Sequence, residues 1–417
     1  MAQLTDDCFA FGGPLLAVDD VERLIAERVT PVVETEEVAL AEAGGRVLAD
    51  DVIAPIDLPP FDNSAVDGFA VRHMDVGTGE TKLAVTDRLT AGRAAAREIG
   101  AGEAIRIFTG APMPAGADTV FMQEDVRIED AAVIVPPGLK RGANRRLAGE
   151  DVKRGSLALA AGRRLQPQDL GMAAALGLRT LPMRRRVRVA LFSTGDEIVE
   201  PGAPLPAAGL YDANRALLRG LLARLGAEVS DLGILRDDPG RLAVRLAAAA
   251  QGHDLVLTSG GVSTGEADYV RKAIEAAGKL VFWRVAIKPG RPVAMGVVRG
   301  TAFVGLPGNP VAVFVTFARI VRPLLLRLAG AAPEPLIALP VTAGFAYRKK
   351  KGRREYVRVS LTRRADGRYE AVKHPQDGAG VISSLTATDG LAELADDVTE
   401  IAPGQTIGFI PYSVLAG

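Results

Sequence analysis

Cysteine and histidine are scarce in this sequence. Among its 417 residues there are one cysteine, Cys8, and three histidines, His73, His253 and His374. A single cysteine cannot form an internal disulfide or a cysteine cluster that binds zinc. The histidines are far apart and lack the H-x-x-x-H spacing of paired metal ligands. The sequence therefore predicts neither a disulfide scaffold nor a metal centre built from cysteine or histidine.

Long hydrophobic runs and an excess of one charge are also missing. The longest apolar run, VAVFVTFA at 311–318, is far shorter than the roughly 20 residues that span a bilayer. The first residues have no basic region followed by an apolar core, so they do not resemble a secretory signal. Lys plus Arg and Asp plus Glu number 50 each, which gives no net charge to attract nucleic acid. We expect a cytoplasmic protein with neither a membrane nor a nucleic acid as partner.

Composition and length indicate a folded chain with more than one domain. Apolar residues make up 48% of the sequence, and at about 150 residues per domain the length suggests two or three domains. Residues 18–29 have the apolar spacing of a helix, and we expect a second helix over 36–44. Between 53 and 148, prolines, glycines and short β-type runs predict a β-rich domain.

Two different patterns follow this region. From 187 to 329, β-branched apolar runs alternate with amphipathic helical segments, which predicts a mostly parallel sheet covered on both faces. After a linker at 330–335, residues 336–417 alternate with a period of two, as expected of a small all-β domain. The predicted fold class is therefore a multidomain α/β and β protein with a central α/β domain.

Carboxylates and glycines follow the predicted strands of this α/β region. Glu197 follows the strand VRVALFS, Asp237 follows the strand that ends in GIL, and Asp268 follows DLVLTS after a Gly-rich turn. In an open α/β sheet, such strand ends meet at the ligand site. Gly-rich turns suit phosphate, and carboxylates beside a phosphate require a divalent cation such as Mg²⁺ between them. These residues predict a Mg²⁺–phosphate site for a nucleotide, although each acid alone could instead be the N-cap of the next helix.

One motif in the same region favours a different chemistry. The sequence G-V-S-T-G at 261–265 matches the nucleophile elbow G-x-S-x-G, which would make Ser263 a covalent nucleophile. The histidine that follows it in the chain is His374, in the predicted β tail. Dinucleotide and P-loop sites lack their signatures, because the chain has neither G-x-G-x-x-G after a strand nor G-x-x-x-x-G-K-[ST]. A serine hydrolase is the alternative enzyme.

A series of motifs spans most of the chain. In order they are PPFDNSAVDGFAV, IFTGAPMPAGADTVFMQED, RRLAGEDV, RVALFSTGDEIVEPG, LYDANR, ILRDDP, TSGGVSTGEADYV, AIKPGRPVAMG and GLPGNPVAVFVTF. Jointly they resemble the MoeA/gephyrin family, the molybdopterin molybdenumtransferases of molybdenum cofactor synthesis. The motifs run in the family's order from about residue 20 to 320, and the β tail fits the family's last domain.

The resemblance implies a subunit of four parts. They are a discontinuous N-terminal and linker domain (1–52 and 149–182), a β-rich domain (53–148), an α/β domain that binds molybdopterin and nucleotide (183–330) and a C-terminal β-barrel (331–417). The resemblance also implies a homodimer, in which the α/β domain of one subunit faces the β-rich domain of the other across the active cleft.

The reaction that the resemblance implies is insertion of molybdate into adenylyl-molybdopterin, with Mg²⁺-dependent cleavage of the adenylate and release of AMP. A separate molybdopterin adenylyltransferase would supply the substrate, because the chain is too short to hold such a domain as well. Gephyrin-like proteins use the same fold to bind receptor peptides, so a scaffold is the second interpretation. The acids and Lys288 at the predicted cleft favour the enzyme.

The family's functional positions carry over to this sequence residue by residue. Glu197, Asp237 and Asp268 would bind Mg²⁺ and orient the nucleotide. Lys288 would contact phosphate or molybdate as a point charge, and Asp67 would complete the site from the partner subunit. The positions that would line the nucleotide, phosphate or partner side of the site are Thr109, Asp151, Gly260, Gly261, Ser263, Arg284, Pro307, Gly308, Asn309 and Arg353.

Two positions depart from the family's pattern. Arg284 stands where the family often has lysine, which keeps the charge but changes the hydrogen-bond geometry. Ala379 replaces a hydroxyl residue that is sometimes found after the first glycine of QDGAGVISS. The case for anion binding by that loop is weaker as a result.

Overall fold

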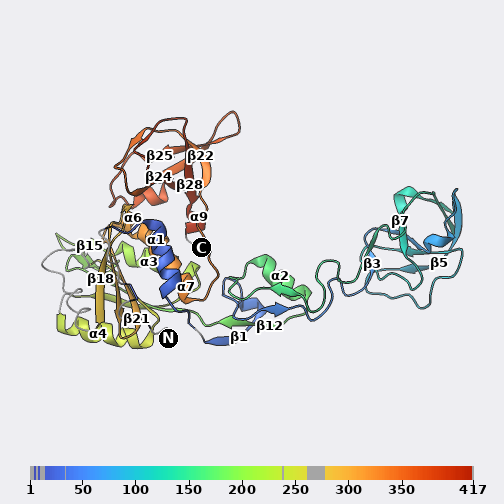
Figure 1. The fold of residues 1–417 in the computed structure, drawn as a ribbon, viewed down its shortest axis with the longest axis horizontal. Coiled ribbons are helices and arrows are strands. Elements are labelled where there is room, and N and C mark those ends of the chain that lie inside the picture. Colours follow the sequence, from blue (N-terminus) through green and yellow to red (C-terminus); the bar gives the residue numbers. More distant parts are fainter. Residues whose placement is uncertain are drawn as a thin grey trace. The chain divides into compact units, whose positions relative to one another are not determined.

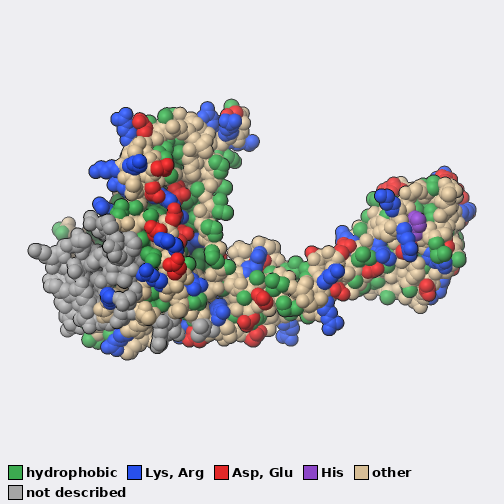
Figure 2. All heavy atoms as spheres, in the orientation of Figure 1, with side chains coloured by type: hydrophobic (Ala, Val, Ile, Leu, Met, Phe, Trp, Pro, Cys, Tyr) green, Lys and Arg blue, Asp and Glu red, His purple; other side chains and the backbone are tan. Residues whose placement is uncertain are grey.

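The computed structural model describes residues 4–5, 8–9, 15–32, 34–236, 239–260 and 278–415. The chain forms two compact units (Figure 1). In the sequence, the second unit is inserted into the first. Unit 1 comprises Met1–Ala49, Ala161–Gln166 and Leu181–Gly417, and unit 2 comprises Asp50–Ala160 and Pro167–Thr180. On the face drawn in Figure 2, basic and acidic side chains are interspersed, in keeping with the balanced charge of the sequence.

Unit 2 is built on a six-stranded sheet in the order β7-β4-β6-β5-β9-β8. Its strands are β4 (Gly68–Val71), β5 (Thr81–Leu89), β6 (Glu103–Ile107), β7 (Thr119–Met122), β8 (Arg127–Glu129) and β9 (Ala132–Val135). Successive residues of a strand point to opposite faces. Accordingly Ala70 enters one apolar cluster, and Phe69 and Val71 enter another, so both faces of the sheet are buried. The predicted β-rich domain is confirmed.

Short elements complete unit 2. They are the pairs β2 (Val52–Ile53) with β11 (Leu157–Leu159) and β3 (Asn63–Ser64) with β10 (Arg145–Arg146), the 3₁₀ turns η2 (His73–Asp75) and η3 (Gln123–Asp125), and the helix α2 (Pro167–Ala175).

Unit 1 contains a second six-stranded sheet, in the order β16-β13-β17-β21-β20-β18. The strands are β13 (Arg188–Thr194), β16 (Glu228–Leu235), β17 (Leu255–Ser259), β18 (Gly278–Arg284), β20 (Pro292–Val298) and β21 (Thr301–Leu306). β16, β13, β17 and β21 are parallel, and β20 runs antiparallel to both of its neighbours. This confirms the mostly parallel sheet predicted for the α/β region.

Helices cover both faces of this sheet. Val189 and Leu191 of β13 pack in one core with α1 (Val18–Arg28), α3 (Ala213–Arg224), α6 (Pro310–Thr316) and α7 (Arg322–Leu328). Ala190 and Phe192 pack on the other side with α4 (Pro239–Gly252), which lies opposite α1 and α3 in Figure 1. The π-helical stretch η4 (Phe317–Val321) joins α6 to α7, and a small pair, β14 (Ile198–Val199) with β15 (Leu210–Tyr211), follows β13.

The C-terminal segment of unit 1 forms a closed five-stranded barrel. Its strands follow the order β24-β25-β22-β28-β26, and β26 pairs back with β24. They are β22 (Leu339–Ala343), β24 (Arg354–Arg363), β25 (Tyr369–Lys373), β26 (Gly390–Leu394) and β28 (Thr406–Pro411). The interior is apolar, with Val359, Ala371 and Phe409 in one cluster. The accompanying elements are β23 (Tyr347–Arg348), β27 (Glu400–Ile401), α8 (Ser383–Thr386) and α9 (Tyr412–Leu415). The predicted C-terminal barrel is confirmed.

One predicted helix is wrong. Residues 36–44 do not form it, because β1 (Thr35–Ala39) pairs with β12 (Thr180–Arg184) and is followed by a 3₁₀ turn, η1 (Leu40–Glu42). Val38 is the one buried residue of β1, so the segment has no apolar helical face to bury. Long-range pairing therefore outweighs the helix propensity of Ala and Glu. The helix predicted over 18–29 is confirmed as α1.

Two further expectations concern membrane-spanning helices and the domain boundaries. Within the described residues, no helix combines the length and apolarity needed to span a bilayer. The four-part division and its boundaries stay a prediction.

Candidate active site

A cleft lies at the carboxyl ends of the parallel strands in unit 1. β13 ends at Thr194, β17 at Ser259 and β21 at Leu306, and each strand is followed by a turn that contains glycine. The cleft holds a cavity of about 280 Å³. Its walls include Ser193, Thr194, Glu197, Asn214, Gly260, Gly308 and Asn309. This is the edge at which open α/β sheets bind ligands.

Two turns of this cleft require glycine. Gly260 has φ +85°, and a Cβ there would lie 2.6 Å from the carbonyl oxygen of Thr194. Its N–H donates to the carbonyl oxygen of Leu306 at 3.2 Å, which ties the ends of β17 and β21 together. Gly195 has φ +136°, and a Cβ there would lie 2.7 Å from Oε2 of Glu197. Because glycine has no side chain, the backbone of these two turns is not covered by one, which allows a ligand to approach it closely.

Three polar side-chain atoms in the wall lack a partner among the described residues. Ser193 Oγ, Thr194 Oγ1 and Asn214 Oδ1 are buried and make no hydrogen bond to that part of the chain. Asn214 Nδ2 donates to the carbonyl oxygen of Gly308 at 2.7 Å, which fixes the amide so that Oδ1 is left as an acceptor. Buried polar atoms are nearly always satisfied in folded proteins. A polar ligand would satisfy these atoms.

Acidic side chains in the cleft have two different roles. Asp212 is the N-cap of α3, because its carboxylate accepts from the backbone N–H of Arg215 at 3.0 Å and from that residue's Nε at 3.0 Å. Glu197 is exposed and makes no ion pair among the described residues. Asp237 and Asp268 lie outside the described residues. Within the part of the chain that is described, no group of three His, Cys, Asp or Glu side chains could hold a metal ion.

Lys288 and Arg353 meet at a buried carboxylate elsewhere in unit 1. Lys288 ends β19 (Ile287–Lys288), which pairs in parallel with the first two residues of β24. Its Nζ donates to Glu355 Oε2 at 3.0 Å, and Arg353 Nε donates to Glu355 Oε1 at 2.7 Å. Burial lowers the pKa of Lys288, but its hydrogen bonds to Glu355 and Tyr347 outweigh burial, so the pKa is raised. Lys288 is therefore charged at neutral pH.

Helix α6 links these two regions. Asn309 precedes α6 and lines the cleft. The backbone N–H of Val311 donates to the carbonyl oxygen of Ala379 at 3.0 Å, so the barrel loop rests on the start of α6. A Cβ on Gly290, two residues after Lys288, would lie 2.4 Å from Cγ2 of Thr316. Contacts with α6 therefore hold three segments in place. They are the PGNP turn (307–310), the KPG turn (288–290) and the barrel loop that contains Ala379.

Asp67 and Thr109 form a pair in unit 2. Asp67 Oδ1 accepts from the backbone N–H of Thr109 at 2.8 Å and from its Oγ1 at 2.8 Å. These bonds, with the nearby charge of Arg106, lower the pKa of Asp67. Its second oxygen has no partner among the described residues. Asp67 is therefore an ionised carboxylate that is fixed through one oxygen and free at the other.

Three family models match the chain in order. The model of the MoeA N-terminal region, domains I and II, matches residues 16–177. That of a probable molybdopterin binding domain matches 190–327, and that of the MoeA C-terminal region, domain IV, matches 340–412. A molybdopterin molybdenumtransferase of Haemophilus influenzae is 37% identical, over 97% of this chain and 100% of its own length. The chain belongs to the MoeA family.

Other relatives agree with this assignment. A molybdopterin molybdenumtransferase 2 of Mycobacterium tuberculosis is 35% identical, over 94% of this chain and 98% of its own length. The crystal structure of a molybdopterin biosynthesis MoeA protein from Pyrococcus horikoshii matches with a TM-score of 0.81 and 30% identity, over 95% of this chain and 100% of that one. Membership of the MoeA family confirms the predicted fold class, the interpretation as an enzyme and a role in molybdenum cofactor biosynthesis.

The family's site positions fall into three groups in this MoeA member. Glu197, Gly260, Gly308 and Asn309 line the cleft, and Pro307 adjoins it through its carbonyl oxygen, 3.4 Å from Ser259 Oγ. Lys288 and Arg353 meet at Glu355, and Asp67 meets Thr109. The described hydrogen bonds do not join Asp151 to Asp67; its backbone N–H donates to Leu58. Arg284 ends β18 opposite Pro292, and Gly261 and Ser263 lie outside the described residues.

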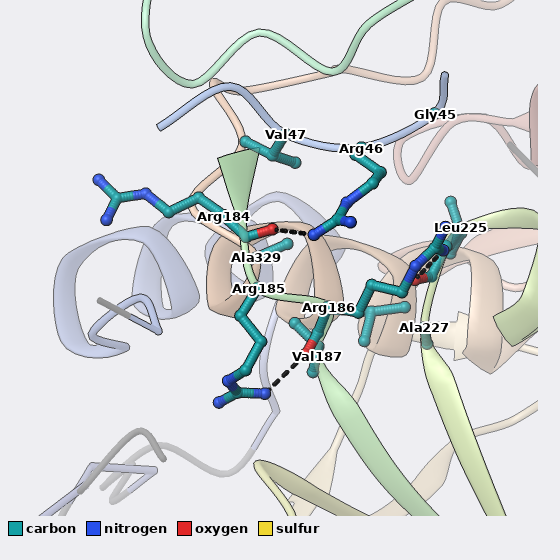
Figure 3. A pocket seen from close by; sticks show the side chains of 12 residues that line it. Gly45, Arg46, Val47, Arg184, Arg185, Arg186, Val187, Leu225, Ala227 and Ala329 are labelled. Carbon is teal, nitrogen blue, oxygen red and sulfur yellow. Dashed lines mark hydrogen bonds between the residues drawn. The ribbon is translucent and has the colours of Figure 1, made fainter. Parts of the chain in front are cut away.

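A second basic region proves to be structural. Arg184, Arg185 and Arg186 line a small crevice of about 20 Å³ with Arg46. Figure 3 shows their guanidinium groups pointing in different directions. Arg46 donates to the carbonyl oxygen of Arg184 at 2.9 Å, and Arg186 donates to that of Gly226 at 3.0 Å. Arg185 pairs with the buried Asp254 at 3.0 Å. Because these charges serve backbone and carboxylate partners, the crevice is not an anion site.

Sequence reasoning missed three residues near the predicted sites. They are Glu355 and Tyr347, which contact Lys288, and Asn214 in the cleft wall. Asn214 belongs to the LYDANR motif, which marked the segment without giving the residue a role. No spacing in the sequence relates Tyr347 or Glu355 to Lys288.

Proposed function

We propose that this member of the MoeA family inserts molybdate into adenylyl-molybdopterin, with cleavage of the adenylate and release of AMP. The cleft at the ends of β13, β17 and β21 carries the proposal. It combines glycine turns that suit phosphate with the exposed carboxylate of Glu197. It also contains three buried polar atoms that have no partner within the described part of the chain. If the cleft had only a structural role, burying these polar atoms without hydrogen bonds would destabilise the fold.

Mg²⁺ fits the donors of this cleft. The ion prefers one or two carboxylates and takes phosphate oxygens and water as its other ligands. Glu197 offers an exposed carboxylate with no ion pair among the described residues, and we assign Asp237 and Asp268 as the further ligands. When bound, Mg²⁺ would neutralise charge on the phosphate.

In our proposal, backbone and side-chain groups of unit 1 bind the phosphate, the molybdate and the rest of the substrate. A Cβ at Gly308 would meet nothing within 4 Å, so this turn leaves room for phosphate oxygens to approach the backbone. Asn214 Oδ1 accepts a hydrogen bond from an N–H or O–H group of the substrate. Lys288 and Arg353 hold the oxygens of molybdate or phosphate through charge-assisted hydrogen bonds.

Asp67 and Thr109 complete the site in our proposal, from the partner subunit of a homodimer. The ionised carboxylate of Asp67 would accept hydrogen bonds from the substrate through its free oxygen, while Thr109 holds the other oxygen in place. A separate molybdopterin adenylyltransferase would supply the adenylated substrate.

The test is AMP release from adenylyl-molybdopterin by the full-length protein with Mg²⁺ and molybdate. Glu197→Gln should lose most of this activity, because it removes the negative charge that would hold Mg²⁺ beside the phosphate. Glu228→Gln is the matched control, since Glu228 is an exposed acid on β16 of the same sheet and only pairs loosely with Arg188. Equal activity in the two variants would exclude the proposed role of the cleft.

A further inference from the structure

Glu355 is a buried carboxylate that holds two cations. Its side chain is 1% exposed, and in the β19–β24 pairing it stands directly opposite Lys288. It accepts from Lys288 Nζ at 3.0 Å through Oε2 and from Arg353 Nε at 2.7 Å through Oε1. A buried charge is tolerated only when it is paired and hydrogen-bonded in this way.

Tyr347 holds the same lysine from a second direction. Its hydroxyl donates to Glu355 Oε2 at 2.9 Å and accepts from Lys288 Nζ at 3.2 Å. The Tyr347 ring centroid lies 5.7 Å from Nζ, within the range of a cation–π contact. Lys288 is thus fixed by a carboxylate, a hydroxyl and an aromatic ring.

Both cations keep donors for a ligand. The ammonium of Lys288 has three donors, two of which bond to described residues, and its side chain is 48% exposed. Arg353 directs Nε and Nη2 to Glu355, and its side chain is 32% exposed. Its Nη1 has no partner among the described residues. Two cations and one carboxylate leave this cluster with a net positive charge, as an anion site requires.

We propose that Glu355 and Tyr347 are positioning residues, which fix Lys288 and Arg353 as a preorganised clamp for a tetrahedral oxyanion. The proposal rests on the proposed function, which gives the two cations contact with molybdate or phosphate. Long lysine and arginine side chains lose conformational entropy when a ligand orders them. In the clamp this ordering is already present in the folded protein, which favours binding.

The negative charge of Glu355 by itself would weaken oxyanion binding, whereas its positioning role would strengthen it. A carboxylate beside the clamp repels an oxyanion, so removing its charge would strengthen binding if the cations stayed in place. If Glu355 instead positions them, Glu355→Gln should weaken molybdate binding about 10- to 100-fold, the range for one hydrogen bond to a charged group. The direction of the change therefore separates the two roles.

The experiment is calorimetric titration of the full-length protein with inorganic molybdate, and in parallel with inorganic phosphate to identify the preferred oxyanion. Glu355→Gln, Tyr347→Phe and Lys288→Ala are compared with the natural protein. Tyr347→Phe keeps the ring and should lose less affinity than Glu355→Gln. The control is Glu400→Gln, because Glu400 is an exposed carboxylate on β27, which pairs with the strand of Tyr347. This control should bind like the natural protein.

The pH dependence of binding gives a second readout. The groups that face Lys288 are Glu355 and Tyr347, and Arg353 and Lys349 in turn face Glu355. Although burial lowers the pKa of Lys288, contacts with Glu355 and Tyr347 raise it overall. The natural protein should therefore bind molybdate up to a higher pH than Glu355→Gln. A partly misfolded variant would bind fewer ions without this shift.

Each result of the binding experiments either supports or overturns the positioning role of Glu355 and Tyr347. Equal or tighter binding by folded Glu355→Gln, together with a loss in Lys288→Ala, overturns the positioning role and leaves the oxyanion site intact. Undiminished binding by Lys288→Ala, or none by the natural protein, overturns both the clamp and the proposed function of Lys288. If Glu355→Gln does not fold, Tyr347→Phe decides, because unchanged affinity and pH dependence would overturn the proposal.

Discussion

Replacing Gly260 with alanine should destabilise the α/β sheet and damage the cleft together. The residue has φ +85°, and the added Cβ would lie 2.6 Å from a backbone oxygen, that of Thr194. The left-handed conformation costs an L-residue about 1–2 kcal/mol, and relief of an overpacked contact typically costs about 1–3 kcal/mol. The sum, roughly 2–5 kcal/mol, is large beside the typical 5–15 kcal/mol of a folded domain, as an order-of-magnitude guide.

Urea unfolding of the full-length protein, followed by circular dichroism, measures this loss. Gly220→Ala is the matched control, because Gly220 lies in α3 of the same fold and a Cβ there meets nothing within 4 Å. Alanine in a helix interior should stabilise the protein by up to about 1 kcal/mol. Gly260→Ala should therefore unfold at lower urea and release AMP more slowly, and Gly220→Ala should do neither. A Gly260→Ala protein with the natural midpoint and natural activity would refute the geometry of the turn.

Further predictions address the metal, the nucleophile and the assembly. Chelation should stop AMP release and added Mg²⁺ should restore it, whereas chelator-insensitive turnover would remove Mg²⁺ from the proposal. Ser263→Ala should slow the reaction by about ten- to a hundred-fold at most, as for loss of one hydrogen bond to a charged group; stoichiometric labelling of Ser263 by a fluorophosphonate would support the serine hydrolase instead. Light scattering should give about twice the subunit mass of 43.7 kDa, and an active monomer would contradict the shared cleft. Asp67→Asn and Asp268→Asn should each abolish turnover, yet verified heterodimers of the two should regain some activity, since one of their clefts would be intact.

The parallel sheet and the glycine turns at its carboxyl edge could be predicted because they depend on local patterns. Apolar runs such as VRVALFS form strands that are buried on both faces, and the glycines after them mark the turns. Gly260 in particular stands where the backbone needs a positive φ.

Other features depend on contacts between distant segments, which leave no periodic signal. The segment 36–44 has helix-forming residues, but its pairing with β12 more than a hundred residues later makes it a strand and a turn. Glu355 and Tyr347 meet Lys288 only because β19 pairs with the start of β24. The motif matches named Lys288 and Arg353, and the buried carboxylate between them emerged only from the structure.

The central claim is that molybdate insertion and adenylate cleavage occur together in one reaction. It is tested most directly by measuring, in one sample, the AMP released from adenylyl-molybdopterin and the molybdenum bound to the pterin product. We predict that the two amounts rise in equal proportion, and that omitting molybdate stops both. AMP release at the same rate without molybdate, or molybdenum incorporation without AMP release, would contradict the account.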